Sequence, residues 1–323
     1  MKIAKIYGFL KKDLDRIEVA LNNVIQAEHP VLRKASTQLL EAGGKRIRPV
    51  FVLLSGQFGN YDMERMKTVA VSLELIHMAT LVHDDVIDDA ELRRGKPTIR
   101  QMYDNRVAMY AGDYILARSL ESITSLRKPN AHLVLSKTIV EVCIGEIEQI
   151  KDKYDWSQQL RDYLRRIKRK TALLIATSCK LGAIAADVPE EIANKLYRYG
   201  YYIGMSYQII DDILDFTSSA TELGKPAGHD LLQGNITLPV LYAMQDETFY
   251  ALLKEAFANP DTVNEAHMHD LVRNLNQTNA ISCSYQLSDL YLKKALAIVD
   301  QLPNNKAKNT LRDIAKYIGK RRS

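Results

Sequence analysis

The chain has 323 residues, 46% of them hydrophobic, so it is long enough to bury a large core. Its formal net charge of +5 is small and dispersed, and we expect no nucleic acid among its partners. The N-terminal stretch alternates apolar and charged residues, and no later apolar run reaches transmembrane length. We therefore expect neither a signal peptide nor a membrane span, and a cytoplasmic location.

Apolar residues recur at intervals of three and four along almost the whole chain, which predicts an all-α fold. The long expected helices favour a large bundle with a central cavity, and no linker divides it, so we expect a single domain over residues 1–323. In chain order, the predicted helices cover residues 5–27, 32–42, 49–58, 64–88, 106–125, 129–154, 157–186, 190–216, 236–259, 280–301 and 306–319. The cysteines have no CxxC spacing and are expected to be core thiols: Cys143, Cys179 and Cys283.

Two connections have the composition of functional loops. GGKRIRP joins two helices through glycines and a proline, and it leaves Lys45, Arg46 and Arg48 on a short exposed connector. The loop over residues 217–235 is rich in glycine, serine and threonine, and loops of this length are usually functional or disordered. The densest basic run, over residues 161–170, fits either a solvated helix face or a phosphate site.

An acidic cluster, HDDVIDD, ends the helix predicted over residues 64–88. Its DDxxD spacing places Asp84 and Asp88 one turn apart on the same helix face, and Asp85 is rotated by about 100° to flank them. Acidic side chains at a helix C-terminus oppose the helix dipole, at a cost of about 0.3 to 1 kcal/mol per charge. A bound cation would remove that conflict, although a single cluster of this kind is equally well explained as a solvated helix end.

The same spacing occurs again in DDILD, near the C-terminal end of another apolar helix. Its carboxylates are Asp211, Asp212 and Asp215. Repetition at equal spacing and equal helix position favours a function over two solvated helix ends. Carboxylate oxygens without a set of His or Cys ligands suit Mg²⁺, which is commonly shared with substrate phosphates.

His83 directly precedes the first cluster, so the sequence also fits the His-Asp doublet of all-α metal phosphohydrolases. That site would need further histidines on neighbouring helices. His229 and His269 also precede an aspartate, but they lie outside the predicted helices, and this alternative leaves the second DDxxD unexplained. An EF-hand is excluded because its loop needs acids at alternate positions around a central glycine.

Basic residues complete the pattern of a diphosphate site, since arginine suits bidentate contact with phosphate and lysine acts as a point charge. The groups are Lys45 with Arg48, Arg93 with Arg94, Lys170 with Thr171, and Lys225. Together with the acidic clusters they describe a site for two diphosphates, one bridged through Mg²⁺ and one held by cations alone. Such a site suits ionisation of an allylic diphosphate, in which Mg²⁺ and lysine stabilise the leaving group and an apolar cavity shields the carbocation from water.

In their order along the chain, the motifs resemble those of the trans-isoprenyl diphosphate synthases: GGKRIRP, ELIHMATLVHDDVIDDAELRRGKPT, KTA, GMSYQIIDDILDF and GKPAGHDLLQGNITLPVLYA. VCIGEIEQIKDKY and YLRRIKRKTALLIATS are similar to the catalytic component of two-component heptaprenyl diphosphate synthases. The resemblance implies an all-α prenyltransferase that elongates an allylic diphosphate, such as farnesyl diphosphate, with isopentenyl diphosphate to an all-trans heptaprenyl diphosphate for a quinone such as menaquinone. It also implies a smaller noncatalytic subunit or a homodimer as partner, and a transient membrane contact for product release.

The resemblance assigns roles to individual residues. Isopentenyl diphosphate would be held by Lys45, Arg48, His77 and Arg94. The allylic diphosphate would be held by Arg93, Lys170, Thr171, Gln208 and Lys225. The Mg²⁺ ligands would be Asp84, Asp88 and Asp211, with support from Asp85, Asp212 and Asp215. Lys170 and Thr171 would also lie near the carbocation, and the released diphosphate would act as the base. Some relatives have a second lysine at the position of Asn235, so the resemblance gives Asn235 no anion-binding role.

The helix that leads into the first cluster is the expected ruler for product length. Ala79, Ile76 and Ser72 fall on one stripe, which short-chain synthases of this family close with an aromatic residue. Because Ala79 and Thr80 are small, the resemblance implies a medium to long product. The stripe spans only about 10 Å, at about 1.5 Å per residue, so it does not count isoprene units.

Two other functions use part of the same pattern. A terpene cyclase also ionises prenyl diphosphates, but such enzymes usually carry an Asn/Ser/Glu pattern in place of the second DDxxD, and this pattern is absent here. A noncatalytic subunit that sequesters prenyl diphosphates would need neither intact acidic clusters nor Lys170. Such a subunit would release no pyrophosphate from allylic and homoallylic substrates, which separates it from a synthase.

Overall fold

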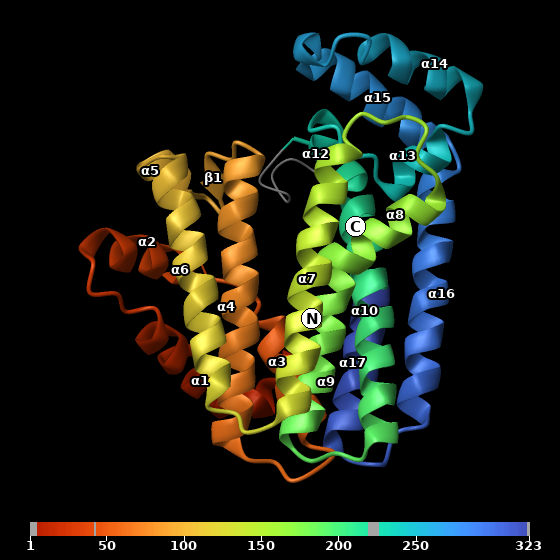
Figure 1. Cartoon of the computed structure of the whole chain (residues 1–323). Coiled ribbons are helices and arrows are strands. Elements are labelled where there is room, and N and C mark those ends of the chain that lie inside the picture. The colour runs from red at the N-terminus through yellow and green to blue at the C-terminus, as the bar shows by residue number, and fades with distance from the viewer. Residues whose placement is uncertain (1–4, 42, 219–225, 322–323) are drawn as a thin grey trace. The chain divides into compact units, whose positions relative to one another are not determined.

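The computed structural model of the protein describes residues 5–41, 43–218 and 226–321. Helices dominate this part of the chain (Figure 1), which confirms the all-α prediction. A short antiparallel hairpin, β1 (Leu92–Arg93) with β2 (Lys96–Pro97), follows the first acidic cluster. Among the described helices, none is long and apolar enough to cross a bilayer.

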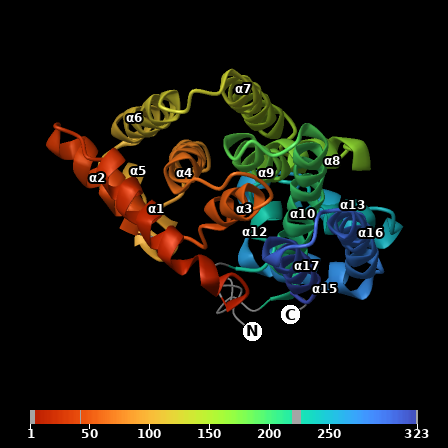
Figure 2. The same cartoon turned by 90° about the horizontal axis from the view of Figure 1, so that it is seen from below.

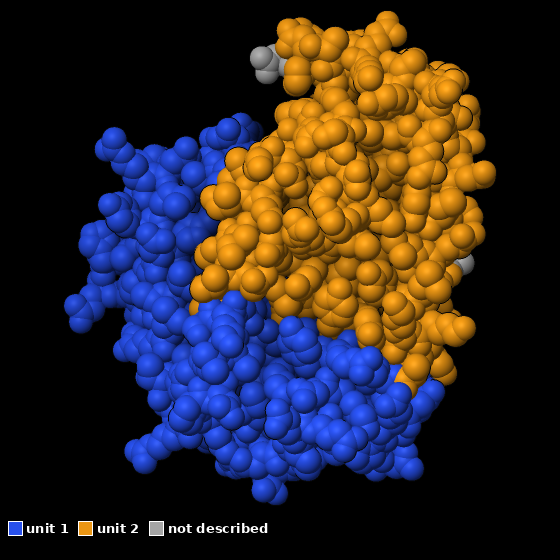
Figure 3. All heavy atoms as spheres, turned by 45° about the vertical axis from the view of Figure 1, so that its right-hand side comes forward, with its two compact units in different colours: residues 1–138, 174–200, 298–314 blue, residues 139–173, 201–297, 315–323 orange. Residues whose placement is uncertain are grey.

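The chain forms two compact units, which Figure 3 draws in different colours. Unit 1 comprises residues 1–138, 174–200 and 298–314. Unit 2 comprises residues 139–173, 201–297 and 315–323. The single domain expected over the whole chain stays a prediction.

Unit 1 contains the N-terminal helices and the first acidic cluster. Its own elements are η2 (Gly8–Leu10), α1 (Lys11–Val24), α2 (Pro30–Glu41), α3 (Ile47–Gly56), α4 (Met63–Ile87), the β1–β2 hairpin, α5 (Ile99–Met102) and α6 (Asn105–Thr124). Helices that contribute residues to both units are α7 (Pro129–Lys151), α9 (Leu173–Ala185), α10 (Glu190–Thr217), α16 (Ala280–Asp300) and α17 (Lys306–Gly319).

α4 is the central helix of unit 1 and packs against α1, α3 and α6 (Figure 2). Its N-terminus is capped by Asp62, whose carboxylate accepts a hydrogen bond from the backbone N–H of Arg65. Residues 69–76 are all buried, so every face of the helix is covered over two turns, as expected inside a bundle. This packing gives the acidic cluster at the C-terminal end of α4 a rigid support.

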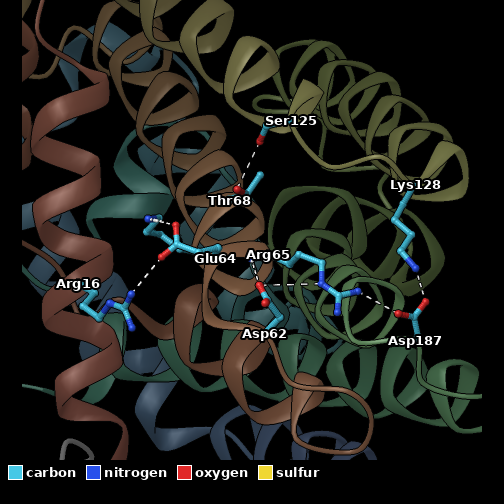
Figure 4. A network of polar contacts seen from close by, with 9 residues as sticks. Arg16, Asp62, Glu64, Arg65, Thr68, Ser125, Lys128 and Asp187 are labelled. Carbon is cyan, nitrogen blue, oxygen red and sulfur yellow. Dashed lines mark hydrogen bonds and ion pairs between the residues drawn. The ribbon is translucent and has the colours of Figure 1, made fainter.

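Ion pairs connect the start of α4 to neighbouring elements of unit 1 (Figure 4). Arg65 Nη1 lies 2.9 Å from Asp187 Oδ2, and Lys128 contacts the same carboxylate. Arg16 of α1 lies 3.0 Å from Glu64. All these side chains are partly exposed, and exposed ion pairs add little stability. Packing of its buried faces, and not these ion pairs, therefore holds α4 in place.

Unit 2 arranges its helices around two apolar clusters. Its own elements are α8 (Leu160–Ile167), the π-helical turn η3 (Lys168–Ala172), α12 (His229–Leu232), α13 (Leu238–Ala243), α14 (Glu247–Ala256), η4 (Pro260–Thr262) and α15 (Glu265–Gln277). One cluster joins α8, α10 and α13 through Tyr163, Ile209 and Leu238. The other includes Phe249 of α14 and Leu271 of α15. The first cluster thus anchors the part of α10 that carries the second DDxxD.

The structure corrects the predicted elements at several places. Residues 157–186 form α8, a π-helical turn and α9 instead of one regular helix. The helix predicted over residues 236–259 is broken, because α13 ends and the Asp246 carboxylate then caps α14 by accepting from the Phe249 N–H. α15, with its polar start NEAHMHD, was missed, and the loop predicted over residues 217–235 contains α12.

The cysteines differ in exposure, and the prediction of three core thiols is only partly right. Cys179 is buried, Cys283 is intermediate, and Cys143 is exposed on α7. Burial raises the pKa of Cys179 to about 12, so this thiol stays protonated at neutral pH. For Cys143, the prediction is wrong.

Candidate functional site

The first acidic cluster lies at the C-terminal end of α4, in unit 1. Asp84 and Asp88 are half-buried, and the Asp88 N–H donates to the Asp84 carbonyl oxygen at 2.8 Å. Asp85 is 4% exposed, and its carboxylate accepts a hydrogen bond from Arg93 Nε at 2.8 Å. The chain reverses directly after α4, where Asp89 has a φ of +50° and the Ala90 N–H donates to the Asp85 carbonyl oxygen at 2.9 Å, and this turn brings Arg93 of β1 back onto the helix end. Burial raises the pKa of Asp85, and Arg93 opposes this shift.

His83, which precedes this cluster, contacts α6. Its Nε2 lies 3.2 Å from Asp113 Oδ1, and a Cβ atom at Gly112 would come within 2.4 Å of the same nitrogen. These contacts give His83 a packing role between α4 and α6. Across residues 5–41, 43–218 and 226–321, no three His, Cys, Asp or Glu side chains gather closely enough to hold a metal ion by themselves.

A basic cluster surrounds His77, also in unit 1. Arg48 at the start of α3 and Arg93 and Arg94 of the hairpin lie close enough to act on the charge of the imidazole. Burial and these cations hold the pKa of His77 well below its ordinary value, so the ring is neutral at neutral pH. Arg94 also reaches the GGKRIRP connector, because a Cβ atom at Gly44 would lie 2.9 Å from its Nη1. The structure therefore brings together Arg48, His77 and Arg94.

Arg46 does not lie on the surface as the connector's sequence predicts. Its backbone is left-handed, and its guanidinium lies 2.7 Å from Glu18 and 3.2 Å from Glu74. Only 13% of its side chain is exposed. Lys45 beside it is exposed, and its carbonyl oxygen accepts a hydrogen bond from the Tyr7 hydroxyl at 3.3 Å. Arg46 therefore anchors the connector from within, while the Lys45 side chain stays accessible.

The second acidic cluster lies in the last turns of α10, in unit 2. Asp211 is half-buried, and its Oδ1 lies 3.0 Å from Nη1 of Arg321, near the end of the chain. Asp215 is 1% exposed, and its Oδ2 accepts a hydrogen bond from the Asp230 N–H at 3.2 Å. The two carboxylates thus share a helix face but differ in access to solvent.

Asp212 is the most constrained residue of this cluster. It is 3% exposed, and its two oxygens accept hydrogen bonds from Tyr163 OH at 2.7 Å and from Gln208 Nε2 at 2.8 Å. Burial, with the nearby charge of Asp230, raises the pKa of Asp212 to about 7. Its oxygens are therefore engaged with protein donors.

Lys170 and Thr171 lie in η3, and π-helical turns of this kind are frequent at functional sites. The Thr171 hydroxyl donates to Gln208 Oε1 at 2.6 Å. Gly204 makes this contact possible, because α10 passes η3 so closely that a Cβ atom at Gly204 would lie 2.5 Å from Ala172 Cα. Gln208, one turn further along α10, is thereby placed opposite Thr171.

The basic run over residues 161–170 is not simply a solvated face. Arg166 is 6% exposed and donates to Gln158 Oε1 at 2.7 Å. Arg169 pairs with Glu141 at 3.0 Å. The solvated-face alternative is wrong for Arg166, because two acceptors in unit 2, Gln158 Oε1 and the Ile236 carbonyl oxygen, compensate the loss of its hydration.

The acidic clusters fit a hard divalent cation by the chemistry of their donors, which are carboxylate oxygens. Asp84 and Asp88 in unit 1 and Asp211 in unit 2 are only half-buried, so their oxygens are within reach of solvent. Such cations take about six oxygen ligands, so water or diphosphate oxygens would have to complete either set.

The residues predicted to set product length all lie on α4. Ala79 and Ile76 are each 2% exposed and Ser72 is 0% exposed, so the stripe is buried. Its role as a ruler stays a prediction. Lys225, predicted to bind the allylic diphosphate, lies outside the described residues.

Three residues that contact the predicted site were missed from the sequence. They are Tyr163, which donates to Asp212, Gln149, which accepts from Lys170 at 2.8 Å, and Arg321. Only Arg321 carried a signal, in the basic end KRRS. Tyr163 and Gln149 occupy ordinary helical positions, and their partners lie far along the chain.

Comparisons of the sequence and of the structure with known proteins agree with each other. The polyprenyl synthetase family matches residues 29–275, which contain both acidic clusters. Over 321 residues the chain is 61% identical to heptaprenyl diphosphate synthase component 2 of Geobacillus stearothermophilus, covering 99% of either chain. The fold matches the crystal structure of heptaprenyl diphosphate synthase from Staphylococcus aureus with a TM-score of 0.92 and 42% identity, over 97% of this chain and 99% of that chain.

A third relative bears on the metal. The crystal structure of a polyprenyl synthase from Caulobacter crescentus, complexed with calcium and isoprenyl diphosphate, matches with a TM-score of 0.94 and 27% identity, over 100% of this chain and 98% of that chain. Its divalent ion and ligand agree with the donor chemistry of the acidic clusters. These matches confirm the resemblance seen in the motifs, and the chain belongs to the polyprenyl synthetase family of prenyltransferases.

Proposed function

We propose that the chain is the catalytic component of a two-component heptaprenyl diphosphate synthase. It elongates an allylic diphosphate, such as farnesyl diphosphate, with successive isopentenyl diphosphate units to all-trans heptaprenyl diphosphate and releases diphosphate. The product supplies the side chain of an isoprenoid quinone such as menaquinone. The observation that carries this proposal is the 61% identity to a heptaprenyl diphosphate synthase component 2 over 99% of the chain.

We infer that each acidic cluster binds Mg²⁺, through Asp84 and Asp88 in unit 1 and through Asp211 in unit 2, because these half-buried carboxylates remain within reach of solvent. When bound, Mg²⁺ neutralises the charge that develops on the leaving diphosphate. The other carboxylates of the clusters are buried and accept hydrogen bonds from protein donors, so they support the clusters: Asp85, Asp212 and Asp215.

The substrate roles follow from charge and position. Isopentenyl diphosphate binds the basic cluster of unit 1: Lys45, Arg48, His77 and Arg94. The arginines supply the positive charge that attracts the diphosphate. The neutral His77 adds a hydrogen bond without repelling the arginines. In unit 2, Lys170 and Gln208 act on the allylic diphosphate and Thr171 acts on the carbocation, while Lys225 is assigned to the diphosphate by the resemblance alone. After the C–C bond forms, the released diphosphate acts as the base and accepts the proton that the coupled product loses.

Product analysis tests the proposal. The purified chain is incubated with Mg²⁺, farnesyl diphosphate and labelled isopentenyl diphosphate, with and without the smaller component. Heptaprenyl diphosphate formed only in the presence of the smaller component is the expected result. Formation by the chain alone would make it a homo-oligomeric synthase, and release of no pyrophosphate under either condition would favour a sequestering subunit.

An exposed apolar stripe on α7 is the surface that we propose for the smaller component. Val140, Ile144, Ile147 and Ile150 follow each other at intervals of three or four residues, so they share one helix face. They are 57%, 40%, 67% and 45% exposed, respectively. Contiguous exposed apolar side chains of this kind mark interaction sites on proteins.

Replacing Ile147 with glutamate is expected to weaken binding of the smaller component by at least about tenfold, because a charge would be buried in an apolar interface. Val19→Glu is the matched control, since Val19 on α1 is similarly exposed, at 62% against 67% for Ile147. Calorimetric titration measures both affinities. Unchanged affinity in Ile147→Glu would remove this surface from the proposal, and loss of self-association instead would identify a homodimer contact.

A further inference from the structure

A continuous chain of hydrogen bonds in unit 2 leads from a buried tyrosine to Thr171. Tyr163 OH donates to Asp212 Oδ2 at 2.7 Å, and Gln208 Nε2 donates to Asp212 Oδ1 at 2.8 Å. The Thr171 hydroxyl in turn donates to Gln208 Oε1 at 2.6 Å. The Gln208 amide is fixed by this pattern, because a flipped amide would turn its oxygen toward the Asp212 carboxylate.

The inner end of this chain is buried. Tyr163 is 0% exposed and packs in one apolar cluster with Ile209 and Leu238, and the Arg166 guanidinium lies 5.7 Å from the centroid of its ring. A buried hydroxyl needs a partner, and for Tyr163 that partner is Asp212. Neither side chain can turn away without leaving a buried polar group unpaired, which is costly.

These hydrogen bonds also restrict Thr171, because its hydroxyl carries only one proton. Because that proton is donated to Gln208, the Thr171 oxygen faces its remaining surroundings only as an acceptor. An acceptor stabilises nearby positive charge, but it does not donate to a diphosphate oxygen.

We propose that Tyr163 and Asp212 are positioning residues that hold Gln208 so that Thr171 presents its oxygen lone pairs to the allylic carbocation. This inference rests on the proposed function, since the carbocation arises only if the chain ionises an allylic diphosphate. Asp212 then supports Gln208 and is not a direct metal ligand, in agreement with the hydrogen bonds that both its oxygens accept. The effect is expected in the chemical step and not in substrate binding.

Tyr163→Phe removes one hydroxyl and keeps the ring. We expect kcat with farnesyl diphosphate to fall about tenfold, while the affinity for farnesyl thiodiphosphate, which ionises far more slowly, stays within about twofold. Tyr199→Phe is the matched control in unit 1, because Tyr199 is also 0% exposed and its hydroxyl donates to the Leu311 carbonyl oxygen at 2.7 Å. Both variants are expected to lower Tm, but only Tyr163→Phe lowers kcat. Equal kcat in the two variants would overturn the proposal.

Two further comparisons separate positioning from metal binding. Asp211→Asn is expected to raise the Mg²⁺ concentration at half-maximal rate, and Asp212→Asn is expected to lower kcat without that change. In a Thr171→Val background, which lacks the hydroxyl, Tyr163→Phe is expected to have no further effect on kcat. An Asp212→Asn variant whose Mg²⁺ requirement rises as much as that of Asp211→Asn would overturn the role assigned to Asp212.

The network is also testable without turnover. In protein labelled with ¹⁵N-glutamine, the side-chain amide signal of Gln208, assigned through its loss in Gln208→Ala, is expected to exchange slowly with solvent. Exchange stays slow in Tyr199→Phe and becomes faster in Tyr163→Phe, and unchanged exchange in Tyr163→Phe would overturn the proposal. If this result holds but the wild type forms no polyprenyl product, the proposed function fails while the positioning of Thr171 is supported.

Discussion

Replacement of Asp84 with alanine is expected to lower turnover by about a thousandfold or more, which corresponds to about 4 kcal/mol of transition-state stabilisation. Asp84 lies half-buried on the last turn of α4, where its charge opposes the helix dipole and repels Asp88. Removal of the Asp84 carboxylate therefore relieves electrostatic repulsion in the free protein, and we expect the fold to stay intact. What is lost is a ligand for Mg²⁺ and, with it, neutralisation of the leaving diphosphate.

Asp211→Ala is expected to lower turnover similarly but to cost some stability as well. Its carboxylate lies 3.0 Å from Arg321, whose side chain is only 20% exposed, so the mutation removes the partner of a partly buried cation. Release of pyrophosphate at saturating substrates, together with thermal unfolding, measures both effects.

Asp89→Ala is the control for this pair of mutations. Asp89 belongs to the same acidic stretch but lies outside the DDxxD spacing, its side chain is 77% exposed, and it pairs with Arg100 at 2.8 Å. Its replacement is expected to leave turnover close to that of the wild type. Near-normal turnover in Asp84→Ala or Asp211→Ala would contradict the assignment of the two clusters to Mg²⁺.

The parts of the fold that were predictable from the sequence are those set by local patterns. The helix predicted over residues 64–88 matches α4 within a residue at each end, because a long apolar run begins after the capping residue Asp62. α15 was missed although Met268, Leu271 and Leu275 form an apolar face at helical spacing. The first turn of α15 is polar, so the sequence pattern there did not indicate a helix. The apolar face becomes evident only where it packs into the apolar cluster of unit 2.

The candidate site shows the same division. The two DDxxD clusters are local motifs, and both lie on helix ends as expected. Arg321, in contrast, meets Asp211 only because α17 returns the chain end to α10. The π-helical turn at Lys170 packs against Gly204, and buried Arg166 donates to the Ile236 carbonyl oxygen; both are contacts between distant segments, which periodicity does not encode.

Replacement of Ala79 with tyrosine is expected to convert the chain from a long-chain to a short-chain synthase, with a product several isoprene units shorter. Ala79 is 2% exposed on the stripe of α4 that leads away from the first acidic cluster. If the growing product passes along this stripe, a phenol ring at this position blocks it near the site of chain growth. If no product passes there, the ring overpacks a filled core and costs about 1 to 3 kcal/mol of stability.

A positional series separates these two outcomes. Ile76 and Ser72 lie one and two turns before Ala79, about 4.5 and 10 Å further along the helix at about 1.5 Å per residue. Tyrosine at position 79 should therefore give the shortest product, tyrosine at 76 an intermediate one, and tyrosine at 72 the longest. Chromatography of dephosphorylated products measures the lengths, and unfolding experiments show whether each variant is folded. Folded variants whose products keep the wild-type length would refute the ruler, because a tyrosine that is shifted by one helical turn should change the length of the product.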